Sequence, residues 1–304
     1  MPGLKQIKNK IRSVEKTQTV TRAMEAVSAA KMRKAQSRAL SGRAYARAAA
    51  AILARVSGLR ETANYPLMKK REVKKALYIV ITSDKGLAGA LNSAVLRATL
   101  ADITSRKFST DSVSIIAVGK KASEFFGKRG YKVEIFHPNT DQISSDIVRE
   151  IVNEAAFRFQ DGVTDEVKIA YQNFRSTFEQ IPTLRIVFPL SLEELEKVVH
   201  DIVPVKGLFS EMKNGSYPKT YATEPLQEEI LAAILPKLAG VFVYHALLES
   251  QASEHSARMV AMKSASDKAE EMEHDLTLWF NKARQAAITR EVSEIIGGME
   301  AMAS

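Results

Sequence analysis

A turn between an apolar run and a helical pattern carries the residues best placed to bind a ligand. The segment Thr82–Asn92 reads TSDKGLAGALN and follows ALYIVI at Ala76–Ile81. Nucleotide motifs occupy this position in α/β proteins, because glycines let the backbone approach a phosphate at a helix N-terminus. Here the glycine spacing fits neither the dinucleotide motif nor the P-loop, and Lys85 precedes the glycines. We weigh a phosphate cradle against a tight turn in which Ser83 and Asp84 cap backbone amides, and we favour the turn.

The other reactive side chains form no catalytic or metal-binding pattern. The chain has no cysteine, which excludes a disulfide or thiol switch. No histidine lies three or four residues from another, and the sequence contains neither H-E-x-x-H nor G-x-S-x-G; the five are His137, His200, His245, His255 and His274. The acids between positions 270 and 275 fit a solvated helix face better than catalytic carboxylates. We therefore predict no catalytic residue, no metal site and no cofactor.

Composition and charge narrow the class of protein. An apolar content of 45% and a charged content of 26% suit a folded domain with extensions, and no apolar run is long enough to cross a bilayer. Residues 1–60 hold fourteen Lys and Arg against two acids, whereas residues 222–304 hold seven against thirteen acids. A basic run is usually a solvated face, and nucleic acid or an acidic protein surface are its alternative partners.

The first segment, residues 1–60, predicts one long helix. Its apolar residues recur at steps of three, four and three, as in a coiled coil: Leu4, Ile7, Ile11 and Val14. No proline interrupts the pattern before Pro66. A helix of about 55 residues is roughly 80 Å long, which exceeds a compact domain of this size, so it must pair with another long helix.

The last segment, residues 222–304, predicts the partner helix. Pro225 suits a first turn with Thr223 as its cap, and Pro236 and Gly240 should kink the helix near its beginning. We expect the helix to end at Gly297–Gly298. Long helices at opposite ends of one chain, with opposite charges, indicate an antiparallel coiled coil.

The middle segment, residues 61–221, predicts a central Rossmann-like α/β domain. Short β-rich runs alternate with helical patterns. The expected strands are Ala76–Ile81, Val113–Val118, Lys132–Phe136, Glu166–Tyr171 and Leu184–Phe188. The expected helices are Gly89–Ser105, Lys120–Arg129 and Ser144–Gln160. Most of the sheet should be parallel. The last two strands, joined by about a dozen residues, should form an antiparallel hairpin, and residues 201–224 should form a loop.

Four motifs occur in order along the whole chain. A basic helical start precedes TRAMEAVSAAKMRK at Thr21–Lys34, and the turn at Thr82–Asn92 follows. The last two are SEHSARMVAM at Ser253–Met262 and NKARQAAIT at Asn281–Thr289. Together they resemble the motifs of the γ subunits of rotary F-type ATP synthases. The cysteine-containing insert of chloroplast-type members is missing, so we expect no redox control. Because Met1 directly precedes the first helix, we expect the bacterial type.

The resemblance implies a non-catalytic rotor shaft. Such a subunit turns within a hexamer of alternating α and β subunits and couples proton flow through the membrane sector to ATP synthesis and hydrolysis on β. It also regulates the ATPase activity and the proton flow. The implied partners are the α, β and ε subunits and the c-ring. The implied place is the cytoplasmic side of the cell inner membrane, peripherally bound, with no nucleic acid partner and no homo-oligomer.

The resemblance also implies contact residues. Those implied at the acidic lever of β are Met24, Lys31, Arg33 and Lys34. Those implied at a second β contact, the catch, are Arg284, Gln285 and Thr289. Those implied at the apolar tip in its bearing are Ile288, Val292, Ile295 and Ile296.

Two other classes of protein remain as alternatives. A nucleic-acid-binding coiled coil would fit the basic first helix and should bind DNA with strong salt dependence. Aromatic residues are scarce in that segment, however, where Tyr45 stands by itself. A nucleotide-dependent α/β enzyme with helical arms should bind nucleotide tightly as an isolated chain.

Overall fold

The structure is a computed structural model that describes residues 4–56, 65–191 and 227–303. Its contacts divide the chain into two units, Met1–Ala29 with Arg258–Ser304, and Ala30–Ala257. The expected cap at Thr223 and the expected loop at 201–224 lie outside the described residues.

Two long helices contribute to both units, and we refer to them as the shaft helices. Helix α1 runs from Leu4 to Val56 and helix α6 from Gln227 to Ala303. The predicted end of the second helix at Gly297–Gly298 is wrong, because the helix continues beyond both glycines. Neither glycine takes the positive φ of a C-cap, and a glycine within a helix costs only about 1 kcal/mol. The helix likewise continues through Pro236.

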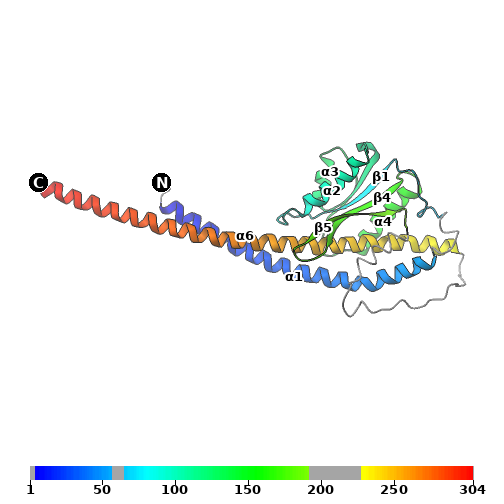
Figure 1. Ribbon diagram of the computed structural model, residues 1–304, viewed down its shortest axis with the longest axis horizontal. Coiled ribbons are helices and arrows are strands. Elements are labelled where there is room, and N and C mark those ends of the chain that lie inside the picture. The colour runs from blue at the N-terminus through cyan, green and yellow to red at the C-terminus, as the bar shows by residue number, and fades with distance from the viewer. Residues whose placement is uncertain (1–3, 57–64, 192–226, 304) are drawn as a thin grey trace. The chain divides into compact units, whose positions relative to one another are not determined.

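In the first unit, the beginning of α1 and the end of α6 lie side by side with opposite chain directions (Figure 1). Ile7 of α1 and Met262 of α6 are buried, as a coiled-coil seam requires. An ion pair joins Arg22 Nη2 to Glu270 Oε2 at 3.1 Å, and the Gln18 amide donates to the same oxygen at 3.2 Å. The prediction of paired antiparallel terminal helices is confirmed.

The second unit contains a five-stranded sheet in the order β3-β2-β1-β4-β5. Its strands are β1 (Ala76–Ile81), β2 (Val113–Val118), β3 (Lys132–His137), β4 (Glu166–Phe174) and β5 (Gln180–Phe188). The first four strands are mutually parallel, and β5 pairs with β4 in the antiparallel sense. The predicted mixed sheet and its final hairpin are confirmed.

The final hairpin has longer strands and a shorter connecting loop than expected. Residues 175–179 join the two strands, in place of the dozen residues predicted. Polar residues at the strand ends, such as Gln172, Asn173 and Gln180, pair through their backbones all the same. An expectation based on apolar runs misses such ends, because ladder hydrogen bonds do not depend on the side chain.

Helices cover both faces of the sheet, which explains why every β1 residue is buried. Helices α2 (Leu91–Ser105) and α3 (Lys120–Gly127) pack on one face, against Tyr78 and Val80 among others. Helix α4 (Ser145–Gln160) and the beginning of α6 pack on the other face. We call residues 65–191 the body. None of the described helices is long and apolar enough to cross a membrane.

Candidate partner-contact sites

The turn at residues 82–92 is held by its own side chains. The Ser83 amide donates to Asn92 Oδ1 at 2.9 Å, and Asn92 Nδ2 donates to Ser83 Oγ at 2.7 Å. Ser83 Oγ in turn donates to the Lys85 carbonyl at 2.5 Å. Lys85 itself is exposed, as is Leu87, which adopts a left-handed φ of 63°. The turn therefore presents a cation and an apolar side chain to solvent.

Side chains of the same turn occupy the nearby N-terminus of α3. Asp84 Oδ1 accepts from the Lys120 amide at 2.8 Å, and Thr82 Oγ1 accepts from the Ala122 amide at 2.9 Å. Asp84 thus caps a backbone amide, as the turn interpretation predicts, and that amide belongs to the neighbouring helix α3. A carboxylate already lies where a helix N-terminus would hold a phosphate, which favours the turn interpretation.

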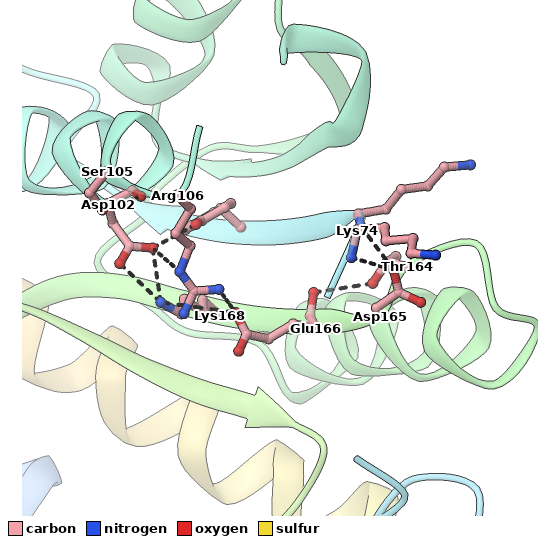
Figure 2. A network of polar contacts seen from close by, with 10 residues as sticks. Lys74, Asp102, Ser105, Arg106, Thr164, Asp165, Glu166 and Lys168 are labelled. Atoms are coloured by element: carbon pink, nitrogen blue, oxygen red, sulfur yellow. Dashed lines mark hydrogen bonds and ion pairs between the residues drawn. The ribbon is translucent and has the colours of Figure 1, made fainter. Parts of the chain in front are cut away.

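A network of charged side chains lies between α2 and the sheet (Figure 2). Lys168 Nζ contacts both Asp102 oxygens at 3.0 and 2.9 Å, and the Tyr78 hydroxyl donates to Asp102 at 2.6 Å. Arg106 joins the group through an ion pair with Glu166. Lys168 and Glu166 are buried. Two cations thus balance two anions, so each buried charge has a partner of opposite sign within the network. These ion pairs hold α2 against β4.

The network shifts the ionisation of its members. Burial, together with the hydrogen bond to Asp102, raises the pKa of Tyr78. Burial also acts to raise the pKa of Asp102, but hydrogen bonds from Tyr78 and Lys168 outweigh it and lower that pKa. The sequence does not predict this network, although Lys168 within the apolar run of β4 is a visible signal of it. No three His, Cys, Asp or Glu side chains among the described residues are placed to hold a metal.

The four lever-contact residues predicted on α1 differ in their surroundings. Met24, in the first unit, is half-buried, whereas Arg33 and Lys34, in the second, are exposed. Lys31 is engaged within the chain, since its Nζ lies 2.6 Å from Asp141 Oδ2. Lys31 therefore differs from Arg33 and Lys34, because it pairs with a carboxylate of its own chain while the other two cations are exposed.

The predicted residues on α6 lie on an uncovered stretch of helix in the first unit. Arg284, Gln285 and Thr289 are exposed, and so is every described residue from Ile288 to Met299. The four predicted tip residues share one helical face at steps of four, three and one; they are Ile288, Val292, Ile295 and Ile296, between 48% and 62% exposed. Figure 1 shows this end of α6 extending past the beginning of α1. We call it the tip.

Comparison with known proteins gives matches over the full length. A family profile described as ATP synthase matches residues 3–302. The ATP synthase gamma chain of Heliobacterium modesticaldum is 38% identical over 304 residues, covering 99% of this chain and 100% of that one. The gamma chain of Brevibacillus brevis is 38% identical over 303 residues, covering 99% of each chain.

Solved structures share the fold. A chain of the Euglena gracilis mitochondrial ATP synthase, in a structure titled OSCP/F1/c-ring, has a TM-score of 0.65 at 20% identity. The match covers 98% of this chain and 94% of that one. A chain of the Tetrahymena thermophila central stalk and c-ring has a TM-score of 0.59 at 24% identity, covering 81% and 99%. With long helices at both ends, a mixed sheet between them and full-length relatives, this chain belongs to the ATP synthase gamma chain family.

Proposed function

We propose that this chain is the central rotor shaft of an F-type ATP synthase. It turns within a hexamer of α and β subunits, and it couples proton flow through the membrane sector to ATP synthesis and hydrolysis on β. It is itself non-catalytic, and it regulates the ATPase activity and the proton flow of the complex. The observation that carries the proposal is the tip, an apolar helical face that the chain leaves exposed.

An exposed apolar face of this extent points to a partner. Four branched side chains on one face of α6 are about half exposed, and Met299, eleven residues after Ile288 on the same face, is 64% exposed. Soluble chains seldom leave such a surface uncovered. Apolar contacts have no directional requirement, so a tip of this kind can turn inside an apolar sleeve without breaking fixed bonds.

Polar side chains near the tip and on α1 supply the proposed torque contacts. Arg33 and Lys34 are the proposed contacts with an acidic lever of β, a role that suits two exposed cations, and Met24 on the same helix is the third proposed contact. The proposed catch consists of Arg284, Gln285 and Thr289. Each exposed ion pair contributes about 0–1 kcal/mol, so the contacts can be made and released as the shaft turns.

The proposed partners are the α, β and ε subunits and the c-ring. The structures that share the fold are titled as a central stalk with its c-ring and as an F1 with its c-ring. We place the chain peripherally at the cell inner membrane, on the cytoplasmic side, as the bacterial type. No homo-oligomer and no nucleic acid partner is part of the proposal.

The experiment compares two double variants in the assembled complex. Arg284→Ala with Gln285→Ala removes a charge and a hydrogen-bonding group from the catch. Lys120→Ala with Lys121→Ala removes two body cations, one exposed and one half-buried, whose ion pairs with Glu124 are long at 3.7 Å. ATP synthesis in vesicles is measured at a fixed proton gradient and normalised to assembled complex.

We expect the catch variant to assemble and to lose about threefold to tenfold in synthesis, corresponding to roughly 1 kcal/mol of coupled contact energy. The body variant should stay within about twofold of wild type, as exposed pairs are weak. Normal synthesis by the catch variant together with impaired synthesis by the body variant would show that torque does not pass through Arg284 and Gln285.

A further inference from the structure

The loop after β3, residues 138–144, receives side chains from both shaft helices. Lys31 of α1 pairs with the Asp141 carboxylate at 2.6 Å, and Arg38 Nη1, two turns further along, donates to the Asp141 carbonyl at 2.8 Å. From α6, Gln251 Nε2 donates to the Thr140 carbonyl at 2.5 Å. His255 Nε2 lies 3.5 Å from Asp141 Oδ1. All these residues belong to the second unit.

The same loop is tied to the centre of the body. Asn139 Nδ2 donates to the Thr82 carbonyl at 2.8 Å, at the end of β1. Just before the loop, the His137 carbonyl accepts from the Gly119 amide at 2.8 Å. The hydrogen bond from Lys31 lowers the pKa of Asp141, and the nearby charges of His255 and Lys85 act in the same direction. A charged carboxylate therefore stands between the body and two helices.

A second set of contacts fixes α6 on the β4–β5 hairpin. Ser253 Oγ donates to the Gln172 carbonyl at 3.2 Å, and Ser256 Oγ donates to the Thr177 carbonyl at 2.7 Å. The buried residues of α6 in this stretch include five polar ones: Ser250, Gln251, Ser253, His255 and Ser256. Hydrogen bonds are directional, so they set both the position of α6 along its axis and its rotation about that axis. Apolar packing would set these less strictly.

We propose that the loop at residues 138–144 is the attachment through which the body grips both shaft helices, and that Asp141 is its positioning residue. This inference rests on the proposed rotor function, because a rotor must pass torque between its body and its shaft. Lys31 then acts inside the chain and holds α1 to the loop. It does not meet the acidic lever of β, unlike the exposed Arg33 and Lys34.

The contacts act together, and this determines which variants are informative. Lys31 and Asp141 are each about half exposed, so their pair is weak by itself. Arg38, Gln251 and Asn139 reach backbone carbonyls and survive the loss of the Asp141 side chain. Neighbouring contacts that share one loop are not expected to be additive. A single variant should therefore show a small effect, and joint removal a large one.

The test uses the assembled complex in vesicles. The first variant is Asp141→Ala, with Asp111→Ala as its control, because Asp111 is exposed and precedes β2, whereas residues 138–144 follow the neighbouring parallel strand β3 at the opposite strand end. The second variant replaces Lys31, Arg38 and Gln251 by Ala. Its control replaces Arg97, Lys128 and Gln160, which are exposed residues of the same three types on the body. ATP hydrolysis and ATP-driven proton pumping are measured on the same vesicles.

We expect the triple variant to lower pumping about fivefold per ATP hydrolysed, while hydrolysis stays within about twofold, because the shaft still turns but grips the body poorly. Asp141→Ala should lower pumping about twofold. Asp141→Glu should restore it, because the carboxylate is kept. Both controls should match wild type.

A covalent bridge keeps the proposal testable if the triple variant assembles badly. The chain has no cysteine, so Lys31→Cys with Asp141→Cys adds this subunit's only two thiols. Bridging them with a short bis-maleimide should return pumping to the wild-type value, whereas a monofunctional maleimide should not. The attachment role is overturned if the double-cysteine variant pumps as well as wild type without the bridge. It is also overturned if bridging the two thiols does not restore pumping.

Two further results separate this inference from the proposed function. If Lys31→Ala lowers hydrolysis but Asp141→Ala does not, Lys31 acts on a partner and the attachment role is overturned. If the unmodified chain does not assemble with α and β subunits, the rotor proposal fails before the attachment is tested.

Discussion

At the scale of single residues, the turn at 82–92 shows what residue type can and cannot reveal. The tight turn, held by Ser83 and Asn92, could be expected from its composition. The partner of Asp84 could not, because Lys120 lies 36 residues further along and comes near only when β1 and β2 pair. Asp141 was missed for the same reason, since nothing near it in sequence marks it as a meeting point of two distant helices.

Gly119 gives the sharpest prediction at this scale. Its φ is +95°, and an added Cβ would lie 2.1 Å from the Thr82 carbonyl oxygen, a backbone atom. We expect Gly119→Ala to lower the free energy of unfolding of the purified chain by about 3 kcal/mol or more, from clash and backbone strain together. Urea titration followed by circular dichroism measures this.

Gly162→Ala is the matched control for that experiment. Gly162 also has a positive φ, of +72°, but the nearest atom to its Cβ would be Arg71 Nη1 at 3.7 Å. Only the left-handed backbone is then penalised, at about 1–2 kcal/mol. Equal losses for the two variants would show that close approach to Thr82 is unimportant.

At the scale of elements, the central strands were the easiest to predict. The runs at 76–81 and 113–118 match β1 and β2 at both ends, because buried parallel strands are apolar throughout and polar residues follow them. The edge strand β5 was predicted four residues short, since an edge strand carries polar residues. The end of α6 was misplaced because glycine favours a helix end only where the chain turns away.

The tip gives a prediction that belongs to a helix face. Replacing Ile288, Val292, Ile295 and Ile296 together by Ser should leave the thermal unfolding of the purified chain nearly unchanged. Each site is already about half exposed, and serine and isoleucine have similar helix propensities, so each change costs less than about 0.5 kcal/mol. Sedimentation velocity should show less self-association than wild type, because the apolar face is gone.

A matched variant at Val20 and Val27, which are also about half exposed, tests whether any exposed apolar residue has the same effect. If the Val20→Ser, Val27→Ser chain loses self-association equally, the tip has no special role. A large drop in melting temperature for the tip variant would mean that the tip is covered within the chain.

At the scale of the whole molecule, the opposite charges and great length of the two terminal helices indicated the function more than any catalytic or ligand-binding motif did. A chain with a large core, two very long helices and no catalytic pattern is better suited to transmitting motion than to converting a substrate. What the sequence could not supply was the attachment of body to helices, since hydrogen bonds such as Ser256 to the Thr177 carbonyl join residues 79 apart.

The purified full-length chain should therefore hydrolyse no ATP above background. The N-terminus of α3 is capped by Asp84, a carboxylate that would repel a phosphate. A coupled-enzyme assay on homogeneous protein measures this, with Lys85→Ala as the comparison. Turnover that copurifies with the chain and falls in Lys85→Ala would revive the phosphate-cradle interpretation of the turn.

The uncovered tip of α6 also has an elastic consequence. Where α1 and α6 run together, twisting one helix means shearing its contacts with the other, such as the Arg22–Glu270 pair. From Ile288 onward α6 carries no such contacts among its described residues, and it contains two adjacent glycines. A rod is most compliant where it is thinnest, so under load this end of the first unit should bend and twist first and absorb sudden steps. It would then act as a spring as well as a bearing surface.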